Sequence, residues 1–74
     1  MTRVEETAIN LTMQWLQNNG YENADDYLQT GGNLVQLAED LYHKETQGDL
    51  QCVWGDRKRR DRFAGSLYLA AESI

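Results

Sequence analysis

The chain has 74 residues, and its twelve acidic and seven basic side chains give it a formal net charge of −5. This length allows one domain with a small core, spanning residues 1–74. The single cysteine, Cys52, excludes a disulfide within the chain. Cys52 and His43 are the only soft metal ligands, too few for a structural zinc site. We therefore expect no metal and no other cofactor.

The amino-terminal residues are polar and charged, and no apolar run approaches the roughly 20 residues that span a bilayer. A lone thiol is typical of a reducing compartment. We expect a cytoplasmic protein that does not enter a membrane.

A first helix is predicted over residues 3–18. Thr2 and Glu5 have the spacing of a capping box, and Asn19-Gly20 ends the helix. Its apolar side chains form two stripes, Val4, Ala8, Leu11 and Trp15 on one side and Ile9, Met13 and Leu16 on another. An arc this wide exceeds what one neighbouring helix covers. Either two neighbours pack on it within the monomer, or part of it meets another chain.

Two further helices follow. Asn23 is a candidate cap for a short helix over residues 24–29, and Asn33 for a central helix over residues 33–46. The central helix has apolar residues at the spacing of one buried stripe: Leu34, Leu37, Ala38, Leu41 and Tyr42. Gly48 stands where a left-handed residue would close this helix.

A last helix is predicted over residues 56–72, with one apolar face made of Phe63, Ala64, Leu67, Tyr68, Ala70 and Ala71. Residues 50–54 have strand-like composition but no partner strand, so helix or irregular turn is favoured. If Gly55 is tolerated, one continuous helix from Asp49 is the alternative. The fold class expected is all-α, a small bundle of three main helices plus one short helix, and dimeric.

The sequence offers little catalytic chemistry, so neither an enzyme nor a small-molecule substrate is expected. Glu39, Asp40 and His43 share a helix face, which is better explained as a solvated polar face than as a weak metal site. Cys52 lies among apolar residues and lacks a nearby base, which favours an inert side chain.

One basic segment interrupts the acidic chain: Arg57, Lys58, Arg59, Arg60 and Arg62. These cations are candidates for electrostatic contact with nucleic acid, although the overall negative charge opposes it. The favoured alternative is a segment that faces protein or solvent, with Arg57 and Arg60 paired to Glu39, Asp40 or Glu45 or to acids of a second subunit.

The function expected is that of a non-catalytic interaction protein, a homodimer that acts as regulator, adaptor or inhibitor of another protein. The first helix supplies the expected contact residues: Val4, Ile9, Met13, Trp15 and Leu16. A charge placed at Ile9 or Met13 is then expected to alter the oligomeric state while helicity survives. Two alternatives stay open, an acidic inhibitor that mimics nucleic acid and a nucleic-acid-binding regulator that uses the segment Arg57 to Arg62.

Overall fold

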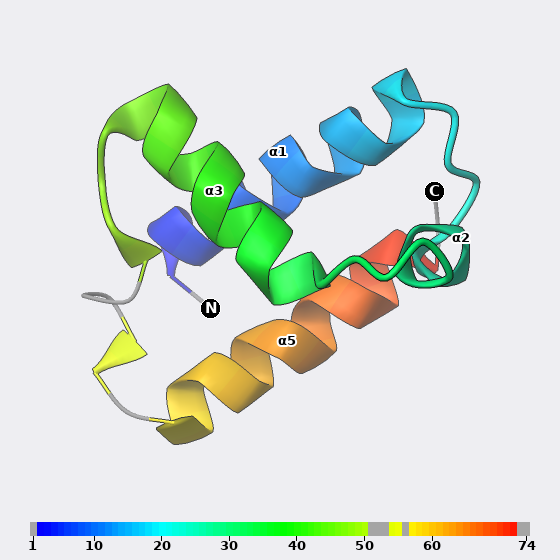
Figure 1. The fold of residues 1–74 in the computed structure, drawn as a ribbon. Helices are drawn as coiled ribbons and strands as arrows, with labels where there is room; N and C mark the ends of the chain where they lie inside the picture. The colour runs from blue at the N-terminus through cyan, green and yellow to red at the C-terminus, as the bar shows by residue number, and fades with distance from the viewer. Residues whose placement is uncertain (1, 51–53, 56, 73–74) are drawn as a thin grey trace.

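The computed structural model describes residues 2–50, 54–55 and 57–72. The described residues form α-helices and connecting turns, with no strand among them. The helices are α1 (Arg3–Asn18), α2 (Ala24–Leu28), α3 (Leu34–Thr46) and α5 (Arg57–Ala71). Each of the three long helices contacts the other two, and Figure 1 shows α3 lying across α1. The predicted all-α fold of three main helices and one short helix is confirmed.

Polar caps begin the first three helices as the sequence predicts. The Thr2 hydroxyl accepts a hydrogen bond from the Glu5 amide at 3.2 Å, and the Glu5 carboxylate accepts one from the Thr2 amide. Asn23 and Asn33 each accept a hydrogen bond from the amide three residues on, at 3.0 and 3.1 Å. Each cap pairs an amide that has no partner within the helix, which fixes where the helix begins.

Two helix ends differ from prediction. The left-handed residue after α3 is Gln47, at φ 63°, and Gly48 serves a different purpose. A Cβ on Gly48 would lie 2.9 Å from the Tyr42 ring, so this glycine allows the loop to approach that ring closely. Gly55 has φ 66°, which breaks the helical path and rules out one continuous helix from Asp49. Leu50 and Trp54, the described ends of the segment 50–54, have helical backbone.

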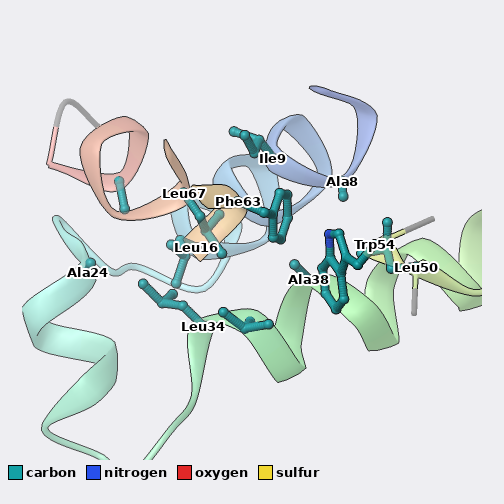
Figure 2. Packing of buried hydrophobic residues seen from close by; sticks show 12 residues of the cluster. Ala8, Ile9, Leu16, Ala24, Leu34, Ala38, Leu50, Trp54, Phe63 and Leu67 are labelled. Atoms are coloured by element: carbon teal, nitrogen blue, oxygen red, sulfur yellow. The ribbon is translucent and has the colours of Figure 1, made fainter. Parts of the chain in front are cut away.

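The core lies between the three long helices (Figure 2). Its buried apolar residues are Ala8, Ile9, Leu16, Ala24, Leu34, Val35, Ala38, Leu50, Trp54, Phe63, Leu67 and Ala71. The Trp54 and Phe63 rings meet with centroids 5.3 Å apart, and Figure 2 shows both rings between α1 and α3. Tyr68, predicted on the buried face of α5, is 40% exposed instead. None of the helices in the described ranges is both long enough and apolar enough to cross a membrane.

Helix α1 is covered from two sides by its own chain. Its buried residues are Glu5, Ala8, Ile9, Thr12 and Leu16, a row that runs between the two predicted apolar stripes. Helices α3 and α5 both contact α1, and Figure 1 shows it crossed by α3. Packing on two sides within the monomer, one of the two explanations for the wide apolar arc, accounts for the buried part of this arc.

Candidate protein-binding surfaces

The five predicted contact residues of α1 differ in what they leave exposed. Ile9 is 8% exposed and Leu16 is fully buried, so neither has surface to offer a partner. Val4, Met13 and Trp15 are half-buried and pack against the core. The periodicity of the sequence located the apolar arc but could not show which part of it α3 and α5 cover.

Trp15 belongs to a cluster of three aromatic rings from α1, the following loop and α2. Its ring stacks on Tyr21 with centroids 6.0 Å apart, and Tyr27 meets both rings edge-on, at 5.6 Å from Trp15 and 5.4 Å from Tyr21. All three side chains are half-buried. Stacked and edge-to-face rings at these separations hold one another in place.

Three exposed carboxylates accompany the rings along the same stretch of chain. Glu22 lies next to Tyr21, and Asp25 and Asp26 form the first turn of α2, where the helix dipole favours negative charge. We name Trp15, Tyr21 and Tyr27 with these carboxylates the acidic aromatic end. It lies at the same end of the molecule as the carboxyl terminus of α5 (Figure 1).

Gly32 lies directly against the Tyr27 ring of the acidic aromatic end, where a Cβ would lie 2.5 Å from the Cζ atom of Tyr27. Gly32→Ala is expected to displace the Tyr27 ring and lower the free energy of unfolding by about 1–3 kcal/mol. Near-ultraviolet circular dichroism, which reports on ordered aromatic rings, should weaken in parallel. Gly65→Ala is the control for the aromatic spectrum, since nothing lies within 4 Å of its added Cβ, and its unfolding free energy should rise because a glycine within a helix costs roughly 0.5–1 kcal/mol relative to alanine. An unchanged aromatic spectrum in Gly32→Ala would contradict this role.

Two side chains of the basic segment are occupied within the chain. An Nη atom of Arg59 lies 3.4 Å from a carboxylate oxygen of Glu5, and the guanidinium of Arg60 lies 5.8 Å from the centre of the Trp54 ring. Arg60 therefore contacts an aromatic ring of the core, a contact that neither alternative for the basic segment anticipates. Arg57, Lys58 and Arg62 are exposed.

Glu5 is a buried carboxylate, only 5% exposed, that the sequence identified as a cap but not as part of the core. Burial alone would raise the pKa of Glu5. The hydrogen bonds from the Thr2 hydroxyl and amide and the interaction with Arg59 outweigh burial, and the pKa lies below its ordinary value. The ionised form of Glu5 therefore stabilises the fold, joining the start of α1 to α5.

Because the folded-state pKa of Glu5 is lowered, its stabilisation is fully present above the ordinary pKa of an unfolded-chain glutamate and is lost as pH falls through the folded-state value. Glu5→Gln is expected to cost about 1–2 kcal/mol of unfolding free energy at pH 7. Urea titrations at pH 7 and pH 3 should show the difference from wild type shrinking at the lower pH. The exposed neighbour variant Glu6→Gln should change stability little at pH 7. A cost for Glu5→Gln that is independent of pH would contradict the assignment.

Several polar groups of α3 are engaged locally. His43 Nδ1 lies 3.1 Å from the Gly48 carbonyl oxygen, and a carboxylate oxygen of Asp40 accepts a hydrogen bond from Gln36 at 3.0 Å. Within residues 2–50, 54–55 and 57–72, no three His, Cys, Asp or Glu side chains form a group that could hold a metal ion. Cys52 lies outside the described residues.

The exposed apolar pair on α5 was not predicted from the sequence. Leu69 is 69% exposed and Tyr68 is 40% exposed. Leu69 lies opposite Leu67 on the helix, and the predicted apolar face did not include it. A helical wheel identifies it as an apolar residue on the solvent side.

Comparisons of the chain with protein-family models, curated proteins and solved structures give no match.

Proposed function

We propose that this protein is a non-catalytic interaction protein, a regulator, adaptor or inhibitor that binds another protein through the acidic aromatic end. In this proposal the protein also associates with itself. The observation that carries the proposal is the combination there of three half-buried aromatic rings with three exposed carboxylates. The partner surface that fits this chemistry is basic, with apolar positions at its centre.

The physical reasons are those that govern ordinary protein interfaces. Tryptophan and tyrosine are enriched among the residues that contribute most to binding energy. The rings of Trp15, Tyr21 and Tyr27 are already ordered by mutual contact, so binding costs little additional side-chain entropy. Exposed carboxylates on a chain of net charge −5 steer it towards a positively charged partner.

The nucleic-acid-mimicking inhibitor is one form of this proposal, in which the basic partner surface is a groove that otherwise holds phosphates. The opposite alternative, direct binding of nucleic acid by the segment Arg57 to Arg62, is less favoured. Arg59 pairs with Glu5 and Arg60 covers Trp54, so two of the five cations already serve the chain's own structure. A gel shift at low salt is expected to show no binding of DNA or RNA.

The decisive experiment compares two variants of equal net charge as affinity baits in extracts of the source cells, with bound proteins quantified by mass spectrometry. The test variant neutralises the acidic aromatic end with Glu22→Gln, Asp25→Asn and Asp26→Asn. The control neutralises three exposed carboxylates elsewhere, with Glu6→Gln, Asp40→Asn and Glu45→Gln. A partner captured by wild type and control but not by the test variant supports the proposal. Equal capture by all three, with helical content unchanged, would refute it.

A further inference from the structure

The outward face of α5 carries a row of exposed residues that is not part of the core of the described chain. Lys58, Arg62, Gly65, Leu69 and Glu72 follow one another at intervals of four, three, four and three residues, and all five are exposed. At about 100° per residue this row lies opposite the buried Phe63, Leu67 and Ala71. Alternating steps of four and three are the spacing by which one helix packs along another.

Gly65, at the centre of the row, is unfavourable for the isolated helix. A glycine within a helix costs roughly 0.5–1 kcal/mol relative to alanine. Its φ is not positive, and nothing lies within 4 Å of an added Cβ, so neither the backbone path nor close packing within the chain requires glycine. A second helix crossing here could approach the α5 backbone closely.

We infer that the occupant of this face is a second copy of the same chain, with the two α5 helices antiparallel about a two-fold axis at Gly65. Lys58 and Glu72 each lie seven residues from Gly65, so the axis brings Lys58 opposite Glu72 of the second copy, twice. A parallel arrangement would place like charges together. The Glu72 amide donates to the Tyr68 carbonyl oxygen at 3.1 Å, which keeps Glu72 on the helical path.

An apolar contact reinforces the charge pattern. Leu69, 69% exposed in the monomer, packs beside the glycine and against the aliphatic part of Arg62 of the second copy. This inference rests on the self-association included in the proposed function and gives it a defined surface, made of residues other than those of the acidic aromatic end.

The contact is small. The 15 residues of α5 span roughly 22 Å at about 1.5 Å per residue. One helix face of this length buries less than the roughly 1,200 Å² typical of stable complexes. Association is therefore weak, with a dissociation constant on the order of 100 µM or above, and strongest at low salt because the paired charges are exposed.

Sedimentation equilibrium up to about 1 mM protein at low salt tests the inference through a charge exchange. Lys58→Glu and Glu72→Lys alone each create like-charge pairs at both ends of the contact and should weaken association at least about fivefold. The double variant exchanges the charges and should restore association to near the wild-type value. Leu69→Asp should abolish association without loss of helicity. A wild-type chain that stays monomeric, or a double variant that stays dissociated, overturns the inference.

Zero-length carbodiimide crosslinking gives an independent readout. Within one straight helix Lys58 and Glu72 are separated by about 21 Å, so a crosslink between them forms only between two copies. The expected product is a dimer that contains a Lys58–Glu72 crosslinked peptide, and a dimer crosslinked only at other residues overturns the inference. The acidic aromatic end contains none of these residues, so Leu69→Asp should still capture the partner. This retained capture distinguishes a failure of the α5 dimer inference from a failure of the proposed function.

Discussion

Replacing Phe63 with alanine is expected to remove a large part of the protein's stability. Phe63 is 1% exposed, and its ring meets that of Trp54 at 5.3 Å in the centre of the core. Phenylalanine-to-alanine changes in cores cost about 3–5 kcal/mol. A chain of 74 residues is expected to have a total stability of only roughly 4–11 kcal/mol. Thermal unfolding followed by far-ultraviolet circular dichroism measures the loss.

Leu69→Ala is the matched control for Phe63→Ala, because it also shortens a large apolar side chain of α5, but one that is mostly exposed. Its effect on monomer stability, measured at micromolar concentration, should stay within about 0.5 kcal/mol. Equal destabilisation by the two variants would contradict the assignment of Phe63 to the core and of Leu69 to the surface.

A charge at Ile9 and a charge at Met13 are expected to have opposite outcomes. Ile9 is 8% exposed and belongs to the core, so Ile9→Asp buries a carboxylate without a partner and should remove the helical signal at 25 °C. Met13 is half-buried at the flank of α1, so Met13→Asp should keep its helicity and lose about 1–2 kcal/mol of stability. Far-ultraviolet circular dichroism and urea titration distinguish the two.

The sequence alone predicts a different result, a changed oligomeric state with helicity intact for both variants. That expectation assumed a first helix with apolar surface left over for a partner. If Ile9→Asp remains helical while its sedimenting mass falls, Ile9 lies between two chains, and its burial within the monomer is contradicted.

Local features of the fold could be predicted because a few neighbouring residues determine them. The caps at Thr2, Asn23 and Asn33 depend on hydrogen bonds that span three residues, and each begins a helix as expected. The helix type follows from apolar residues at a period near 3.6, which is also a local pattern. These rules give the type of the helices in the described residues and the starting points of α1, α2 and α3.

Features that depend on tertiary contacts could not be predicted in the same way. Thr12 is fully buried by the packing of the other helices on α1, and its hydroxyl is satisfied within α1 by donating to the Ala8 carbonyl oxygen at 2.8 Å. Glu5 is buried where Arg59 reaches it from α5, across 54 positions of sequence. Neither burial shows in a helical wheel, and a wheel that treats both residues as polar divides one buried face into two stripes.

The candidate surfaces were located only in part for the same reason. Trp15 was singled out from the first helix, but its contacts with Tyr21 and Tyr27 depend on how the loop and α2 return towards α1. Gly65 was not singled out, because the absence of any neighbour around it is a property of the folded chain.

The dependence of the melting temperature on protein concentration tests most directly whether this chain encloses its first helix unaided. Dilution from about 100 µM to 1 µM is expected to leave both the melting temperature and the helical signal unchanged, because α3 and α5 cover α1 within one monomer. A melting temperature that falls steadily on dilution, with helicity lost at the lowest concentration, would show that α1 needs a second chain to fold and would contradict the enclosed monomer.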